Sequence, residues 1–180
     1  NGGDRTSGFN VPIEVQHIEG KGRAVIATSF IRKGELIYSG LVNPAEFFSI
    51  ESFWQYIISI PRELACDALQ WVYKQDLGDY DGGTQCTPVI CFEMDEGALF
   101  NNGDSDSDVN VGCHPMFGDM YPQLCQKQYF SLKDIYPGEE LLLDYGYFVS
   151  SQAEMLFPPT ILGVQNSTKQ ADSIMHHLIQ

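Results

Sequence analysis

The stretch YFSLKDIYPGEELLLDYGY, residues 129–147, decides the fold of this chain. An aromatic and apolar segment leads into the triplet Tyr-Pro-Gly at 136–138, and an apolar run then returns to Tyr145. Proline followed by glycine marks a turn, and short apolar runs on both sides of a turn are typical of strands. The stretch therefore predicts two strands, over residues 128–132 and 141–144, joined at this turn.

Upstream of this stretch the chain is also made of short strand-like segments. Residues 11–18 alternate apolar and polar side chains, which predicts a half-buried strand. Small and β-branched residues follow at 23–30, and a third short segment lies at 36–39, each after a glycine-containing turn. A further strand is predicted at 88–92, followed by a polar loop at 101–108. The chain is therefore expected to be mostly β.

Residues 41–87 interrupt this pattern with a helical period. Asn43 and Glu46 stand at the ends of a typical helix start, and Pro61 divides the helical segment in two. The second helix is expected to run on toward Gly78. We therefore predict a helical insert whose aromatic stripe belongs to the core.

Composition restricts the partners of the chain. It has 24 acidic and 10 basic residues and a net charge of −14. Such a surface repels nucleic-acid phosphates and attracts cationic peptides. No apolar run is long enough to cross a bilayer. We therefore expect a basic protein or peptide as the partner, with no direct nucleic-acid contact and no membrane contact.

The five cysteines form no CxxC or CxC pair, which argues against a zinc site built on cysteines. Their odd number and loose spacing favour free thiols in a reducing compartment, so we expect an intracellular protein, nuclear or cytoplasmic. The acidic segment 104–108 is similar to the start of a calcium loop. It has Val109 and Pro115 where that loop needs Gly and Glu, so we expect a solvated loop and no metal.

Three segments, taken in order, carry a family resemblance. They are the turn EGKGRA with the run IRKGELIYSG after it, the triplet Phe-Asn-Asn at 100–102, and the closing GEELLLDYGY. Together they resemble the SET domain of protein lysine methyltransferases, over residues 11–148. The resemblance implies a SET fold (β-clip) of small curved sheets, with 41–87 as the variable insert and a knot-like threading of the C-terminal segment. Outside it lie a flexible N-terminus, 1–10, and a C-terminal extension, 149–180, with a short helix over 171–179.

The resemblance also implies an activity and a site. Such an enzyme transfers a methyl group from S-adenosylmethionine to a lysine of a histone tail or another basic protein, and releases S-adenosylhomocysteine. Tyr145 corresponds to the active-site tyrosine, and Tyr38 to a tyrosine that lines the same site. Phe148 or Phe157 is expected to stack on the adenine. The residues implied to bind the cofactor are Lys21, Gly22, Arg23, Asn101, Asn102 and Tyr145.

This chemistry needs alignment more than it needs a strong base. Transfer of a methyl group from a sulfonium to an amine is an in-line displacement, so the reacting atoms must be held in register. A narrow apolar channel and a nearby sulfonium both disfavour the ammonium form of the lysine. Aromatic walls and a few oxygen acceptors are therefore sufficient to orient the amine.

The sequence departs from the family at three points. The usual Asn-His-Ser-Cys-x-Pro-Asn becomes Asn101-Asn102-Gly-Asp and reaches Val-Asn at 109–110 only after extra residues. Leu143 stands where many relatives have an aromatic residue, a position that bears on the number of methyls added. No cysteine-rich zinc module follows, so residues 149–180 or a partner are expected to close the site. The changed loop also favours an alternative, a catalytically inactive SET-like module that binds proteins.

Overall fold

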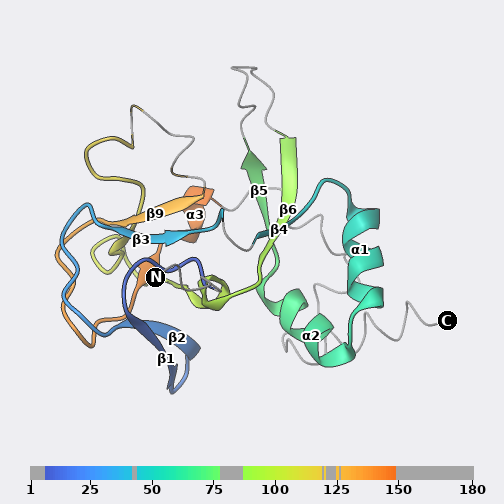
Figure 1. Ribbon diagram of the computed structural model, residues 1–180, viewed down its shortest axis with the longest axis horizontal. Coiled ribbons are helices and arrows are strands. Elements are labelled where there is room, and N and C mark those ends of the chain that lie inside the picture. Colours follow the sequence, from blue (N-terminus) through green and yellow to red (C-terminus); the bar gives the residue numbers. More distant parts are fainter. Residues whose placement is uncertain are drawn as a thin grey trace, which may run out of the picture.

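A computed structural model describes residues 7–41, 44–77, 87–118, 120, 125 and 127–148 of the chain. These residues form four small sheets of two or three strands, together with two helices of 10 residues each. In Figure 1 the sheets of the first and last parts of the chain lie on one side and the two helices on the other. The sheet that belongs to the insert stands between them. The predicted mostly β class with a helical insert is confirmed.

The first sheet is the antiparallel hairpin of β1 (Ile13–Ile18) and β2 (Gly22–Ala27). Gly20 and Gly22 have φ values of +82° and +96°, a region that side chains with a Cβ avoid, which explains the glycines at this turn. β2 is buried from its third residue onward, whereas Val15 in β1 is 41% exposed. The strand predicted at 11–18 is therefore present but more exposed than the expected half-buried strand, because β1 pairs with β2 alone.

The central sheet places β9 (Gln128–Ser131) between β3 (Leu36–Ser39) and β8 (Val111–Gly112). Both pairings are antiparallel. The turn predicted at 136–138 is present, and Gly138 has φ +92°. The main hydrophobic core gathers around this sheet; its largest members with less than 2% exposure are Tyr38, Ile31, Ile37, Ile135, Leu141, Val25 and Val111.

The closing stretch forms a short parallel sheet with a segment about forty residues earlier. β10 (Leu142–Leu143) pairs with β7 (Asn101–Asn102), which follows the 3-10 helix η1 (Glu96–Leu99). The expectation of a plain polar loop at 101–108 is therefore wrong for its first two residues, because β10 supplies them with a backbone partner. The knot-like threading of this segment stays a prediction.

The insert contains a sheet as well as helices. It comprises β4 (Pro44–Phe47), α1 (Ile50–Ser59), α2 (Arg62–Trp71) and β5 (Tyr73–Leu77). β6 (Thr87–Glu93) completes its sheet, in the strand order β4-β6-β5, and reaches beyond the predicted end of the insert at residue 87. Both pairings are antiparallel, and Figure 1 shows the two helices beside this sheet.

Two predicted boundaries of the insert are wrong. Residues 44–47, predicted as a helix start, are extended, because they pair with β6. The helix begins only after Ser49, whose hydroxyl accepts from the Ser52 amide at 3.1 Å. The second helix ends at Trp71 instead of running toward Gly78, and β5 follows at once. The break at Pro61 is confirmed. Asn43 and Gly78 themselves lie outside the described residues.

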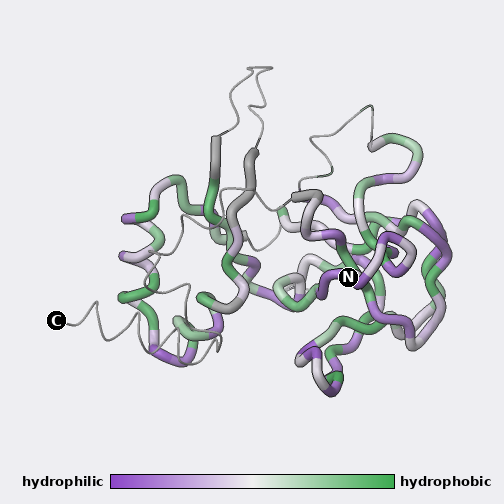
Figure 2. Tube along the Cα trace, turned by 180° about the vertical axis from the view of Figure 1, so that it is seen from behind, coloured by the Kyte–Doolittle hydropathy of each residue, from purple (hydrophilic) through white to green (hydrophobic). Residues whose placement is uncertain are grey.

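The helices and strands of the insert enclose a second core. Figure 2 shows hydrophobic positions recurring along both helices and the strands beside them. The buried members of this core are Phe53, Ile57, Ala65, Ala68 and Ile90. The predicted apolar faces are only partly buried, because Ile58 and Leu64 are 58% and 57% exposed.

The cysteines differ from the expectation of free thiols. Cys113 and Cys125 form a disulfide across a sequence separation of 12, so that expectation is wrong for this pair. Cys66 and Cys91 are free, and burial raises the pKa of the Cys91 thiol to about 12. Cys86 lies outside the described residues. The intracellular location drawn from the thiols stays a prediction.

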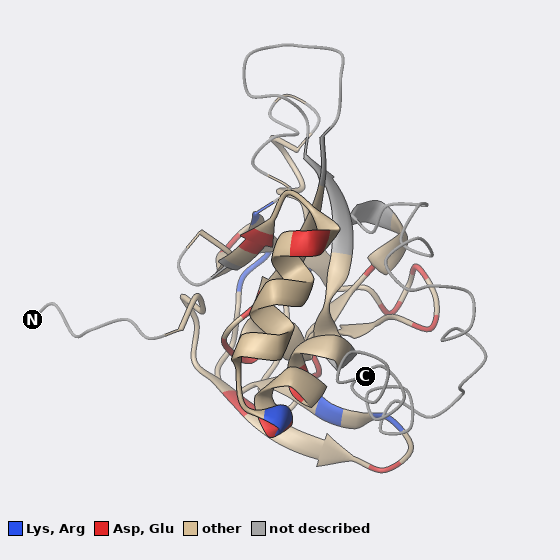
Figure 3. Cartoon of the chain, turned by 90° about the vertical axis from the view of Figure 1, so that its right-hand side faces the viewer, with Lys and Arg blue, Asp and Glu red and all other residues tan. Residues whose placement is uncertain are grey.

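Charge is spread over the whole described chain. Figure 3 shows acidic positions on helices, strands and loops alike, with few basic positions among them. Among the described residues, no helix combines the length and the hydrophobicity that crossing a membrane requires. Likewise, no three His, Cys, Asp or Glu side chains of this part of the chain gather as metal ligands.

Candidate functional site

Tyr145 is held at the start of α3 (Tyr145–Phe148) by two contacts with the segment that contains β7. Its main-chain N–H donates to Oδ1 of Asn102 at 2.8 Å, and its hydroxyl donates to the carbonyl oxygen of Phe100. The residue is 36% exposed, and burial of the phenol raises its pKa. The hydroxyl is therefore protonated and fixed over the β7 segment.

Asn101 joins three distant segments. Its side-chain amide nitrogen donates to the carbonyl oxygen of Arg23 at 3.1 Å and to Oε1 of Glu140 at 2.8 Å. The other carboxylate oxygen of Glu140 forms an ion pair with Lys21 at 3.2 Å. The structure thus brings together Lys21, Arg23, Asn101, Asn102 and Tyr145, which sequence reasoning had placed in one site.

The side chain of Arg23 points to the insert. Its guanidinium lies 3.4 Å from the Asp67 carboxylate and 5.5 Å from the centre of the Trp71 ring. Gly22 has open space beside it, because a Cβ built there would meet no atom within 4 Å. The turn of the first hairpin therefore offers exposed backbone next to Asn101, while its two cations are paired with Glu140 and Asp67.

Asn110 fixes the closing stretch, and sequence reasoning gave it no role. Its side chain is 4% exposed; the amide nitrogen donates to the Glu140 carbonyl and Oδ1 accepts from the Leu142 N–H, both at 2.8 Å. One asparagine thus pairs both backbone groups on either side of Leu141. The signal in the sequence was the match of Val-Asn at 109–110 to the end of the family's asparagine loop.

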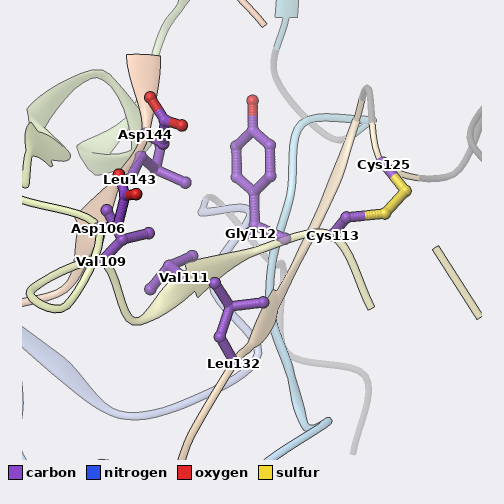
Figure 4. Close-up of a pocket in the computed structure, with 10 residues that line it drawn as sticks. Asp106, Val109, Val111, Gly112, Cys113, Cys125, Leu132, Leu143 and Asp144 are labelled. Carbon is purple, nitrogen blue, oxygen red and sulfur yellow. A yellow bond between two sulfur atoms is a disulfide. The ribbon is translucent and has the colours of Figure 1, made fainter. Parts of the chain in front are cut away.

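An apolar cavity of about 290 Å³ lies beside the closing stretch. In Figure 4 Leu143 and Asp144 stand on one side of it with Asp106 and Val109, while the Cys113–Cys125 disulfide lies on the other. Tyr129, Val111 and Leu132 complete most of the remaining wall. The cavity opens next to the strand that leads directly into Tyr145.

The family comparison decides what this arrangement is. The family model described as "SET domain" matches residues 22–146, well over half of the chain. The chain belongs to the SET domain family. No curated protein sequence matches it.

Solved structures of SET proteins resemble this SET domain at low identity. CpSET8 from Cryptosporidium is 21% identical, covers 74% of this chain and 57% of its own, and has a TM-score of 0.46. DIM-5 of Neurospora, a histone lysine methyltransferase, is 16% identical over 77% of this chain and 53% of its own, with a TM-score of 0.47. The methyltransferase domain of human SETMAR is 17% identical, covers 76% of this chain and 45% of its own, and has a TM-score of 0.46. The SET domain described above thus spans about half the length of these chains.

Tyr38, the second predicted site tyrosine, is fully buried in this SET domain. Its ring packs 5.6 Å from the Phe100 ring and 5.0 Å from the Phe9 ring, measured between centroids. Its hydroxyl lies 3.0 Å from Glu93 Oε2 and 2.9 Å from Asp95 Oδ1, and burial raises its pKa. Tyr38 therefore contacts the Phe100 ring, whereas Tyr145 bonds to the Phe100 carbonyl, and the two hydroxyls have different partners. A role of Tyr38 in the site stays a prediction.

A cluster of phenols and carboxylates extends from Tyr38 and was not foreseen from the sequence. Glu93, 8% exposed, also accepts from the Tyr73 hydroxyl at 3.0 Å, and Tyr73 is hydrogen-bonded to Tyr129. Burial raises the pKa of the Glu93 carboxyl and of both phenols. Some of these residues are more than thirty positions apart in the sequence, so no local pattern reveals the cluster.

The predicted adenine-stacking residues cannot be placed. Phe148 ends α3, but its side chain is not among the described ones, and Phe157 lies outside the described residues. Residues 149–180, expected to help close the site, also lie outside them.

Proposed function

We propose that this SET domain is a protein-lysine N-methyltransferase that uses S-adenosylmethionine and acts on a lysine of a basic protein. The observation that carries the proposal is the joining of the three family segments: Asn101 bonds to Arg23 and Glu140, and Asn102 bonds to Tyr145. The tyrosine hydroxyl, the asparagines and the glycine turn are thereby held at one place.

The backbone around Gly22 fits the amino-acid end of S-adenosylmethionine in polarity. Its exposed N–H and C=O groups can meet the ligand, and the open space at Gly22 admits close approach to the backbone. Asn101 adjoins this turn through its hydrogen bond to the Arg23 carbonyl. When bound, the cofactor supplies a methyl group on a sulfonium, which is an electrophile for an amine.

The apolar cavity beside Leu143 suits the substrate side chain. Burial among Val111, Leu132 and Leu143 disfavours a charged ammonium and shifts a lysine entering there toward the neutral, nucleophilic amine. Asp106 and Asp144 in the same wall act in the opposite direction and attract the cation. The Tyr145 hydroxyl is directed to the Phe100 carbonyl, and together these two oxygens can orient an amine by hydrogen bonds.

The substrate class follows from charge. A chain with a net charge of −14 draws cationic segments toward it and repels phosphate backbones. We propose a basic protein, a histone tail or a non-histone lysine, as the methyl acceptor.

The test combines cofactor binding with methyl transfer. Calorimetric titration of S-adenosylmethionine should give binding to the wild type and to Tyr145→Phe alike. Transfer of labelled methyl to mixed histones or basic peptides should fall roughly a hundredfold or more in Tyr145→Phe, because an aligned hydroxyl is lost. Tyr136→Phe is the matched control, since Tyr136 is 58% exposed and packs only against Phe30, 5.3 Å away between ring centres, among the described rings. Absence of cofactor binding by the wild type would overturn the proposal.

One observation favours the alternative, an inactive SET-like module that binds proteins. Both described bonds of the Asn101 amide nitrogen go to the chain itself, and the Asn102 amide nitrogen donates to the Gly103 carbonyl at 2.8 Å. These asparagines therefore work as internal braces. The module would bind a basic peptide with an affinity that S-adenosylmethionine does not alter, whereas an enzyme would show coupling between the two ligands.

A further inference from the structure

The substrate ammonium must lose one proton before its nitrogen can accept a methyl group, and the described residues offer a route for that proton. Tyr129 is one of the residues that line the cavity beside Leu143. Tyr129 is hydrogen-bonded to Tyr73, and the Tyr73 hydroxyl donates to Glu93 Oε1 at 3.0 Å. Tyr145 is near enough to influence the titration of Tyr129. Phenols and a carboxylate thus form a continuous line away from the proposed amine site.

The far end of this line opens into a second cavity. This cavity, of about 270 Å³, is lined by Glu93 and Asp95 and lies between the insert and the η1 segment. Its other acidic members are Glu96 and Asp67. The same Glu93 carboxylate therefore touches the phenol line through one oxygen and borders an acidic cavity from which a proton can leave for solvent.

Counting hydrogens shows that this cluster can hold an additional proton. Four contacts join its side chains: Tyr129–Tyr73, Tyr73–Glu93, Tyr38–Glu93 and Tyr38–Asp95. Each contact needs a hydrogen atom on one of its two members, and the three phenols supply three. The fourth hydrogen bond forms only when one of the two carboxyl groups carries a proton.

The chain also leaves room for this carboxylate. A Cβ on Gly40 would lie 3.2 Å from Glu93 Oε1 and 3.6 Å from the Tyr38 ring, so a larger residue would press on the Glu93 oxygen that Tyr73 contacts. Asp95 is held separately, by the N–H groups of Gly8 at 2.6 Å and Gly97 at 2.9 Å. Glu93 is therefore the member that depends on phenols for its hydrogen bonds.

We propose that Tyr129, Tyr73 and Glu93 form a relay that carries the proton of the substrate ammonium to the acidic cavity. This inference rests on the proposed methyltransferase function. The ammonium gives its proton to the Tyr129 oxygen while Tyr129 passes its own hydrogen to Tyr73. Tyr73 passes its hydrogen to Glu93, so that a neutral amine and a protonated carboxyl group result and each phenol ends neutral. Glu93 then releases the proton into the cavity and returns to the carboxylate.

Burial supports this role, because it raises the pKa of the Glu93 carboxyl above its ordinary value and makes the group a better proton acceptor. Other titratable groups face Glu93 from each neighbouring element: Tyr38 on β3, Glu46 on β4, Tyr73 on β5, Cys91 on β6, Asp95 after β6 and Tyr129 on β9. Lys127 is engaged by Glu46 in an ion pair. The hydrogen bonds from Tyr38 and Tyr73 lower the Glu93 pKa, whereas the carboxylates of Asp95 and Glu46 raise it in the same direction as burial, and the net pKa is raised.

The experiment is a pH profile of methyl transfer at saturating S-adenosylmethionine and a basic peptide. In Glu93→Gln the amine can only deprotonate through solvent, so the rate should rise about tenfold per pH unit toward the ordinary lysine pKa near 10.4. The wild type should depend on pH more weakly. Near pH 7 the rate of methyl transfer by Glu93→Gln should be on the order of a hundredfold below that of the wild type. By pH 9 this difference in rate should be smaller by a factor of at least about ten.

Two further variants separate a relay from a structural effect. Tyr73→Phe breaks the line but keeps the Glu93 carboxylate and its hydrogen bond from Tyr38, and it should give the same steep profile. Glu96→Gln removes a carboxylate of the same cavity, with no described hydrogen bond to the phenols, and should keep the wild-type profile. All three should bind the cofactor as the wild type does.

Parallel profiles for the wild type and Glu93→Gln, whatever their separation, would overturn the relay and leave the methyltransferase proposal standing. A wild type that binds S-adenosylmethionine but transfers no methyl group at any pH would overturn the proposed function, and the relay with it.

Discussion

Replacing Asn110 with alanine should destabilise the fold and the site together. The substitution removes two hydrogen bonds of 2.8 Å from a side chain that is 4% exposed. It also leaves the Leu142 N–H and the Glu140 carbonyl without these partners. Each neutral hydrogen bond contributes about 1 kcal/mol, and each buried group left unpaired costs about as much again, so the free energy of unfolding should fall by about 2–4 kcal/mol.

The measurement is equilibrium unfolding in urea. At a slope of about 2 kcal/mol per molar urea, typical of a chain of this size, the midpoint should fall by roughly 1–2 M. Asn10→Ala is the matched control: Asn10 is exposed, its side chain donates to the nearby Gly8 carbonyl at 3.2 Å, and a change of no more than about 0.5 kcal/mol is expected.

A second substitution distinguishes the two bonds. Asn110→Asp keeps an acceptor for the Leu142 N–H but cannot donate to the Glu140 carbonyl while it is ionised. Its buried carboxyl group should have a folded-state pKa above the unfolded value, so the penalty should be present at neutral pH and should shrink as the pH falls through the folded pKa. Equal midpoints for Asn110→Ala and Asn10→Ala would refute the reasoning that Asn110 holds the closing stretch.

Three other predictions concern the rest of the fold. Burial raises the folded-state pKa of Glu93 above the unfolded value, so the folded chain holds this proton more tightly and its stability should fall as the pH rises from the unfolded pKa through the folded pKa. Glu93→Gln should remove this part of the pH dependence of the free energy of unfolding, measured in urea from about pH 5 to about pH 8. The same pH dependence in the variant and the wild type would contradict this prediction. Reducing the Cys113–Cys125 disulfide, which closes a loop with a sequence separation of 12, should lower the free energy of unfolding by about 3 kcal/mol, while a variant with serine at both positions should not respond to the reductant. Ser49→Ala should cost about 1 kcal/mol through loss of the cap on α1, and Ser59→Ala, outside the first turn, should cost less; equal losses would argue against capping.

Local patterns in the sequence predicted the strands that lie next to glycine turns. Gly20, Gly22 and Gly138 have positive φ values, so the residue type alone marks where the chain reverses. β3 was predicted with its observed bounds, and the strands around the turn at 136–138 were one or two residues too long. Strand ends depend on pairing partners, which a local pattern does not contain.

The insert shows where local reasoning fails. Asn43, proline and Glu46 form a good helix start by residue type, yet the segment is a strand because Glu46 pairs with Cys91, 45 positions later. Ser49 provides an equally good cap six residues after Asn43, and the chain uses that one. Tertiary pairing therefore chose between two local signals of similar quality.

The candidate site was predictable in its residues but not in its bonding. The closing motif and the Asn101-Asn102 pair pointed to one place, and the structure joins them. The partners that fix them, Asn110 and Glu140, lie within the compared motifs, but the motifs do not say which groups they bond. The phenol and carboxylate cluster around Glu93 was missed because its members come from β3, β5, β6 and β9, which only the fold brings together.

The parallel pairing of β7 with β10 sets an order of events during synthesis. Leu142 and Leu143 must have left the ribosome before Asn101 and Asn102 can gain their strand partner, although the hairpin β1–β2 can form much earlier from local contacts. The insert, with its own core, can also fold before then. Tyr145 therefore reaches its position only after every described element before it has been synthesised. The nascent chain carries no assembled site until β10 and Tyr145 have left the ribosome.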